Sequence, residues 1–392
     1  MPRIRRHIQR QNPFAASREA DRRGRAEKQR DPARTRFFAE REVLERDGSF
    51  PFGEGYLYGD AGPSVRDPSW QPGIGTPGTI SAAGHRGTKP QQQDAWGSLR
   101  LRVGKDDAAV LVVADGVSAS GPRAARAAKT AVRVFLRELE QALARVPTNE
   151  ARRHATVEKA MSHAAFFANF EVVRQVLLDR DGSGRFDSGD RRALRRDTGV
   201  DLKAGTLTVA EMRRIAPQLD KVIADEDEAG RSALATFAVA VAVDNDLYTF
   251  ATGDAVVSLY RPGEIEQQRV IQLTHRDQAV VELYTSGEET RGQADLYENV
   301  ITDSLGDSAQ LAGTLRRYPN LLEPGDRVIA ASDGLGPRGP HQGLDRHEIE
   351  AALEAAEPEH AARNLVRGQI EDVDADTYQD NIGVVVLTID PR

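Results

Sequence analysis

The chain has 392 residues, of which 39% are hydrophobic and 29% charged, ordinary values that argue against wholesale disorder and against a collagen-like chain. It contains no cysteine, so disulfides, zinc-thiolate sites, iron–sulfur clusters and cysteine nucleophiles are excluded, and any metal must bind oxygen or imidazole ligands. The net charge of -7 is uneven, because residues 1–36 carry 12 basic and 4 acidic residues while the rest of the chain is acidic.

The first 78 residues predict two segments outside the folded domain. Residues 1–47 form a basic extension that we expect to be disordered or a marginal solvated helix, and such a tail can bind an anionic partner. Residues 48–78 are dense in Gly and Pro and predict a linker. No apolar stretch reaches the roughly 18 residues of a membrane helix, and the N-terminus lacks the apolar core of a secretory signal. The expected location is therefore cytoplasmic, with no transmembrane segment.

The folded domain is predicted to span residues 79–390, with strands and helices in separate runs. Apolar patterning and turn residues predict, in chain order, strands at 98–103 and 108–114, helices at 125–146 and 157–178, strands at 235–243, 246–252, 255–261 and 326–332, helices at 348–358 and 361–368, and a last strand at 381–390. This order favours an α+β fold, with a central two-sheet β-sandwich flanked by helices, over a strict βαβ alternation.

Three of these strands carry an aspartate at one end. Asp115 and Asp333 each follow an apolar strand and precede a glycine, and Asp380 lies just before the last strand. An Asp-Gly pair after a strand is also a common turn, so one such pair alone would carry little weight. Three carboxylates at the rims of buried strands are a suitable ligand set for Mg²⁺ or Mn²⁺, which prefer oxygen ligands.

The sequence resembles the PPM, or type 2C, metal-dependent protein serine/threonine phosphatases. The resemblance rests on ordered segments that include HRGTKPQQQDAWG, VLVVADGVSASGPRAARAA, YTFATGDAVVSLYR, LEPGDRVIAASDGL and YQDNIGVVVL. It implies a β-sandwich flanked by helices, two Mn²⁺ or Mg²⁺ ions, and hydrolysis of phosphoserine or phosphothreonine by a metal-activated water. The partner it implies is a phosphorylated protein, such as a kinase or the target of one.

The resemblance also implies metal ligands. Asp115 matches the carboxylate that bridges the two metals, and Gly116 the backbone carbonyl beside it. Asp333 and Asp380 match the carboxylates that complete the first metal site. Asp94 matches an acidic residue at or just behind the second metal, while Gln93 stands where several members have Glu.

Three neighbouring basic residues are candidates for binding phosphate and for acid catalysis. Many members of the family have an Arg five residues before the early aspartate, where this chain has Lys89, and Arg86 lies eight residues before it. Arg would offer a bidentate fork and Lys a point charge. His85, next to them, is a candidate general acid toward the leaving oxygen.

Two further acidic segments received a different interpretation. The family commonly has Gly-Asp-Ser where this chain has Gly253-Asp254-Ala255, and we interpret the Gly-Asp pair as a structural turn rather than a ligand site. Some relatives hold a third, loose metal through an acidic residue before the strand that begins near Ala235, which would point to Asp225, Asp227 or Glu228.

A second cation site is predicted within residues 170–228, which we interpret as an EF-hand-like helical insertion in the phosphatase domain. The spacing of residues 179–190 matches a twelve-residue EF-hand loop with Gly184 at its sharp turn. The ligands predicted for one Ca²⁺ ion are Asp179, Asp181, Ser183, Arg185 through its carbonyl, Asp187 and Asp190. The ion would stabilise the insert or modulate activity.

The leading hypothesis is a metal-dependent phosphatase, and two alternatives stay open. The first is a pseudophosphatase that binds phosphorylated proteins without hydrolysing them, which the Gln93 and Lys89 departures keep possible. The second is a calcium-responsive adaptor that acts through the insert and the basic tail. Hydrolysis of a generic phosphomonoester that depends on a metal would separate the enzyme from both.

Overall fold

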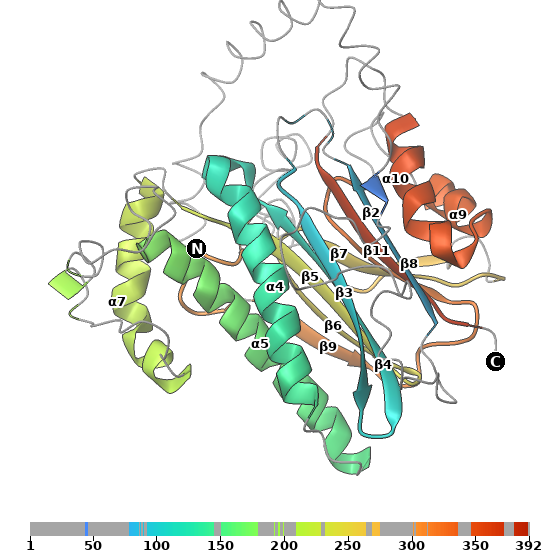
Figure 1. Ribbon diagram of the computed structural model, residues 1–392, viewed down its shortest axis with the longest axis horizontal. Coiled ribbons are helices and arrows are strands. Elements are labelled where there is room, and N and C mark those ends of the chain that lie inside the picture. Colours follow the sequence, from blue (N-terminus) through green and yellow to red (C-terminus); the bar gives the residue numbers. More distant parts are fainter. Residues whose placement is uncertain are drawn as a thin grey trace, which may run out of the picture.

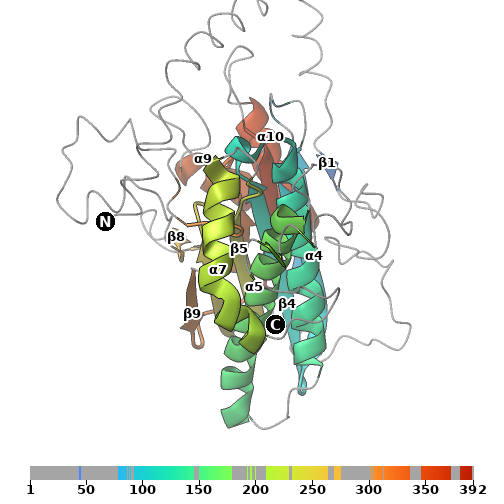
Figure 2. The same ribbon diagram turned by 90° about the vertical axis from the view of Figure 1, so that its left-hand side faces the viewer.

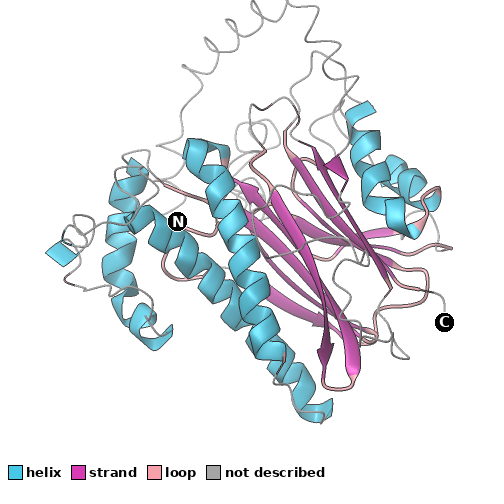
Figure 3. Ribbon diagram, in the orientation of Figure 1, coloured by secondary structure: helices cyan, strands magenta, loops and turns pink. Residues whose placement is uncertain are grey.

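Two antiparallel sheets pack face to face in the computed structural model, with helices on both outer faces (Figures 1 and 3). The structure describes residues 44–45, 78–85, 87, 89, 92–144, 150–178, 192, 195–196, 199, 209–228, 232–263, 269–274, 301, 303–311, 313–335, 346–371 and 380–390. The predicted α+β architecture, a two-sheet sandwich flanked by helices, is thereby confirmed.

The first sheet has six strands in the order β1-β2-β11-β10-β7-β8. Their bounds are Leu44–Glu45 for β1, Thr79–His85 for β2, Val256–Tyr260 for β7, Val270–Gln272 for β8, Arg327–Ala331 for β10 and Ile382–Thr388 for β11. The last strand of the chain therefore lies between β2 and β10, which brings residues near 80, 330 and 380 side by side.

The second sheet has five strands in the order β3-β4-β5-β6-β9. Their bounds are Ala95–Val103 for β3, Asp106–Gly116 for β4, Ala235–Val243 for β5, Asp246–Thr252 for β6 and Thr314–Tyr318 for β9. Every residue of β5 is buried, as expected for a central strand covered on both faces.

Helices cover each sheet on its outer side. The bounds are Ser118–Arg123 for the 3-10 helix η2, Ala124–Leu143 for α4, Glu150–Leu178 for α5, Val209–Glu228 for α7, Arg346–Glu354 for α9, Pro358–His360 for the 3-10 helix η5 and Ala361–Glu371 for α10. Helices α4 and α5 pack on the second sheet, α7 packs on α5, and α9 and α10 pack on the first sheet (Figure 2). In the described part of the chain, no helix has the length and apolar character needed to cross a membrane.

The alternation of side chains along β4 explains how the core is divided. Val110 and Val112 face α4 and α5, whereas Leu111 and Val113 face the opposite sheet. Successive side chains of a strand point to opposite faces. Asp115 continues the second series, so the strand directs its carboxylate toward the other sheet.

Two described elements lie near boundaries that were expected from the sequence. Leu44–Glu45 pairs with β2 inside the segment expected to be a disordered extension. Residue 170, the proposed start of the insertion, lies within α5, because its apolar residues pack on α7. The predicted calcium loop at 179–190 lies outside the described residues.

Candidate metal centre

Strand pairing in the second sheet places two aspartates side by side. Ala95 of β3 lies opposite Ala114 of β4, so one further step along both strands sets Asp94 opposite Asp115. Both are buried, with Asp94 fully so, and each carboxyl group influences the pKa of the other.

A third aspartate lies where the chain passes from one sheet to the other. Strand β6 ends at Thr252 and β7 begins at Val256 in the opposite sheet, with Gly253 and Asp254 between them. Gly253 has a φ of 83°, and a Cβ there would lie 2.5 Å from the Cβ of Thr236. Only glycine fits this crossing without strain, and it delivers Asp254 to the end of the sandwich.

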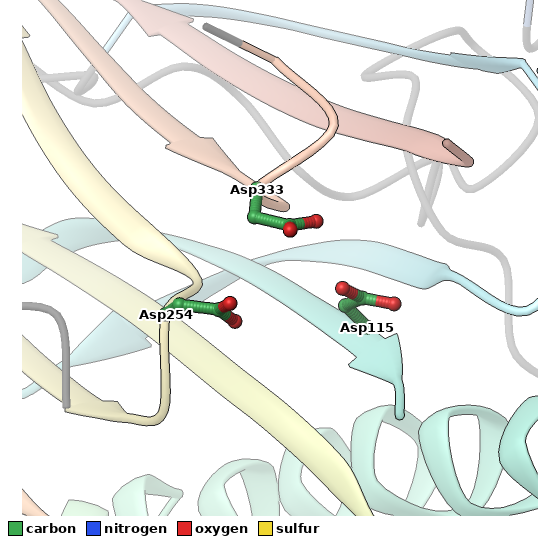
Figure 4. A group of neighbouring side chains, drawn as sticks. All are labelled: Asp115, Asp254 and Asp333. Carbon is green, nitrogen blue, oxygen red and sulfur yellow. The ribbon is translucent and has the colours of Figure 1, made fainter. Parts of the chain in front are cut away.

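A fourth aspartate reaches the same place from the first sheet. Ala331 of β10 lies opposite Val256 of β7, and two further steps along both strands set Asp333 opposite Asp254. Asp115, Asp254 and Asp333 each offer a carboxylate oxygen, and these oxygens lie within 4.8 Å of one another. Figure 4 shows the three side chains directed into one space from three different segments.

Burial and mutual repulsion perturb the acids at this end of the sandwich. Burial raises the pKa of Asp115 well above its ordinary value, and the charges of Asp94, Asp333, Asp380 and Asp254 raise it further. Burial also raises the pKa of Asp94 to about 7. Ionising several neighbouring carboxyl groups together costs free energy, and a cation between them makes their ionised forms favourable. The donor set, all hard oxygen, fits Mg²⁺ or Mn²⁺.

Neighbouring residues hold Asp94 in place. Ser332 Oγ donates to Asp94 Oδ2 at 2.7 Å and accepts the backbone N–H of Gly383 at 2.9 Å. A Cβ on Gly383 would lie 3.4 Å from Asp94 Cβ and 3.2 Å from the ring of Trp96, so the strand passes close behind the acid. Asp94 Oδ1 is buried with no hydrogen-bond partner among the described residues. This orphaned oxygen is a candidate metal ligand or a ligand for a metal-bound water.

Gly116, the predicted carbonyl ligand, is the last residue of β4. A Cβ there would lie 2.5 Å from the backbone carbonyl of Ala124 at the start of α4. Because β4 leads directly into this close contact, the peptide after Asp115 has a fixed position.

Asp380 takes part in an ion pair. Its Oδ1 atom contacts Lys89 Nζ, and the side chains are 14% and 9% exposed. Lys89 also donates to Ser118 Oγ at 2.7 Å. Lys89, which the sequence suggested as a phosphate ligand, is therefore bound to one of the predicted metal ligands in this structure.

Among the described residues, no hydrogen bond or ion pair joins His85 to an aspartate. Its Nδ1 accepts the backbone N–H of Gly87 at 3.0 Å, and burial lowers the pKa of the imidazole, which is therefore neutral at neutral pH. Along β2, His85 shares the face of Ala83, which packs toward α10, whereas Ile80 and Ala82 face the other sheet. Arg86 lies outside the described residues.

The remaining predicted acids lie elsewhere. Asp225, Asp227 and Glu228, suggested for a third metal, belong to the last turn of α7, where Asp225 is exposed. The described part of the chain contains one group of three acids with metal-ligand spacing, and it includes none of these residues.

Asp254 is the residue that sequence reasoning missed. The Gly253-Asp254 pair does form a turn, as interpreted, but the turn carries a buried carboxylate into the centre, where it is 3% exposed. A signal was present in the sequence, because Asp254 lies immediately before an apolar strand, as Asp380 does.

Residues 82–367 match the family model for protein phosphatase 2C. The match covers more than half of the chain, so the chain belongs to the protein phosphatase 2C family, and it is a metal-dependent protein phosphatase. Comparison with curated protein sequences gives no match.

Solved structures share the fold at low sequence identity. The serine/threonine phosphatase Stp1 from Staphylococcus aureus is 15% identical, with a TM-score of 0.52 over 82% of this chain and 99% of that one. A bacterial serine phosphatase carrying a point mutation is 14% identical, with a TM-score of 0.52 over 80% and 99%. The catalytic domain of the phosphatase PstP, solved with two manganese ions, is 18% identical, with a TM-score of 0.48 over 80% and 98%.

Proposed function

We propose that this chain hydrolyses phosphoserine and phosphothreonine in phosphorylated proteins. The observation that carries the proposal is the convergence of Asp115, Asp254 and Asp333 within 4.8 Å at one end of the sandwich. Membership of the protein phosphatase 2C family gives that cluster its chemical meaning.

The acids at this end would hold two Mn²⁺ or Mg²⁺ ions. Asp115 lies centrally, since Asp94, Asp333, Asp380 and Asp254 all act on it electrostatically. When bound, such ions make a coordinated water nucleophilic at neutral pH and offset charge on a phosphoryl group. The task of the chain itself is to fix the carboxylates on paired strands so that they need not reorganise on binding.

The cations Lys89 and Arg86 would bind the phosphate, as the family resemblance suggests. His85 accepts a hydrogen bond from the backbone N–H of Gly87, and the residue is only 2% exposed. A general acid must come within hydrogen-bond reach of the leaving oxygen. We therefore assign the leaving-group proton to solvent or to a bound water rather than to His85.

An Asp333→Asn variant tests the proposal. Hydrolysis of p-nitrophenyl phosphate and of a phosphothreonine peptide is measured after chelation and again after addition of Mn²⁺ or Mg²⁺. We expect activity that requires the metal and falls by at least about a hundredfold in the variant. Asp390→Asn, at an exposed carboxylate near the C-terminus, is the matched control and should keep full activity. A folded wild type that binds the phosphopeptide but hydrolyses nothing would favour the pseudophosphatase.

Residues 179–190 are proposed to bind one Ca²⁺ ion, on sequence grounds. Since α5 ends at Leu178 and α7 begins at Val209, the loop would lie between two helices that pack on each other through Phe170, Val173 and Leu219. We expect Ca²⁺ to raise the melting temperature of the full chain, and Asp181→Asn to abolish that rise. A change in turnover on Ca²⁺ addition would show modulation, and an adaptor would bind Ca²⁺ without any phosphatase activity.

The cytoplasmic location, an anionic partner for residues 1–47 and a kinase or its target as the substrate remain proposals from the sequence. Phosphopeptide arrays, and binding of residues 1–47 to anionic vesicles or nucleic acid, would test the last two.

A further inference from the structure

Asp380 belongs to a closed ring of four hydrogen bonds and one ion pair, which we call the Asp380 ring. Lys89 Nζ pairs with Asp380 Oδ1 and donates to Ser118 Oγ at 2.7 Å. Ser118 Oγ donates to Gln93 Oε1 at 3.3 Å. The Gln93 N–H donates to Asn381 Oδ1 at 2.8 Å, and the Asn381 N–H donates to Asp380 Oδ1 at 2.7 Å. The ring thus returns to the carboxylate from which it starts.

The Asp380 ring balances its own charge. It contains one carboxylate and one ammonium, and position 93, where a glutamate would add a second negative charge, is a neutral glutamine. Lys89 and Asp380 are only 9% and 14% exposed, so water screens their attraction weakly. Asp380 Oδ1 is therefore paired with a cation that belongs to the chain.

The Asp380 ring is also linked to the metal centre through three of its residues. Gln93 precedes Asp94 in the chain, Ser118 lies two residues after Gly116, and Asp380 acts electrostatically on both Asp94 and Asp115. A divalent ion drawn to these acids meets Asp380 with its Oδ1 already held by Lys89.

We propose that the Lys89 ammonium and a divalent cation compete for Asp380. This proposal rests on the proposed function, because the competing cation is the metal ion that the phosphatase requires. A metal ion that binds Asp380 Oδ1 displaces Lys89 from that oxygen, so the chain binds metal more weakly than its carboxylates alone would allow. The displaced ammonium then becomes available to a phosphate, which links metal occupancy to substrate binding.

Calorimetric titration of the chelator-treated full chain with Mn²⁺ tests this competition. Lys89→Met removes the competing ammonium. Because close charge pairs couple strongly, we expect the weaker of the two Mn²⁺ ions to bind at least about tenfold more tightly to this variant than to the wild type. Lys89→Arg keeps the charge and should stay within about threefold of the wild type. Ser118→Ala, which keeps both charges and removes one anchor of Lys89, should tighten binding by a smaller factor.

A double-mutant cycle separates competition at Asp380 from a general loss of positive charge. The gain from Lys89→Met should vanish in an Asp380→Asn background, whereas a general field effect would persist there and overturn the proposal. Unchanged or weaker Mn²⁺ binding in both Lys89→Met and Ser118→Ala would overturn it as well. The Ser118→Ala result stands if Lys89→Met fails to fold. Titration measures metal binding and not catalysis. An inactive wild type that binds Mn²⁺ would therefore refute the proposed phosphatase activity without refuting the proposed competition between Lys89 and the metal.

Discussion

Replacing Asp254 by Asn should have opposite effects on the metal-free and the metal-bound protein. Its carboxylate lies within 4.8 Å of that of Asp333, a spacing at which two unit charges repel by about 3.5 kcal/mol at an effective dielectric constant near 20. Burial raises the pKa of Asp115 well above its ordinary value, so the charge of Asp115 adds less to this repulsion. We expect Asp254→Asn to stabilise the metal-free protein by about 1–3 kcal/mol, or roughly 2–6 °C in melting temperature.

The same change should weaken Mn²⁺ binding, because it removes a charged ligand. We expect a loss of at least about tenfold, which corresponds to about 1.4 kcal/mol, and a matching fall in the stabilisation that Mn²⁺ provides. Thermal unfolding with a chelator and then with graded Mn²⁺ measures both effects in one preparation.

Asp246→Asn provides the matched control at the other end of β6. Asp246 is also buried, but it pairs with Arg317 at 3.0 Å and His154 at 3.1 Å and accepts the backbone N–H of Asn320. Its loss should destabilise the protein with or without metal and leave Mn²⁺ affinity unchanged. If Asp254→Asn behaves like this control, Asp254 is a structural residue and the reasoning fails.

Two further predictions concern the same end of the sandwich. Since the pKa of Asp94 is raised to about 7, the native state holds a proton that the unfolded state releases above about pH 4, so metal-free stability should fall as the pH rises from about 4 to 7. Asp94→Asn should flatten this slope in denaturant titrations at pH 5 and pH 8, and an unchanged slope would contradict the assignment. Gly253→Ala should lower the free energy of unfolding by about 1–3 kcal/mol more than Gly263→Ala does. Both glycines have φ near 83°, but a new Cβ at position 253 would clash with the side chain of Thr236, whereas one at position 263 meets no atom within 4 Å. Equal losses in chemical denaturation would show that no clash occurs.

The main strands and helices could be predicted because their causes are local. An uninterrupted apolar run such as β5, or helical spacing of apolar residues over α4, is visible in a short window of sequence. The same holds for Asp115, Asp333 and Asp380, each of which adjoins an apolar strand. Strands β1, β2, β8 and β9 were not predicted, and β8, with three residues, is too short for an alternating pattern to show.

Whether those acids meet was decided by strand order and register, which depend on contacts between residues far apart in the chain. Asp254 became part of the centre because β6 and β7 lie in different sheets and the turn between them crosses the sandwich. Likewise, the sequence identified Lys89 as a cation near the site, but its pairing with Asp380, 291 positions later, exists only because β11 inserts between β2 and β10. Sequence alone determined which side chains were available, and packing of the two sheets determined their partners.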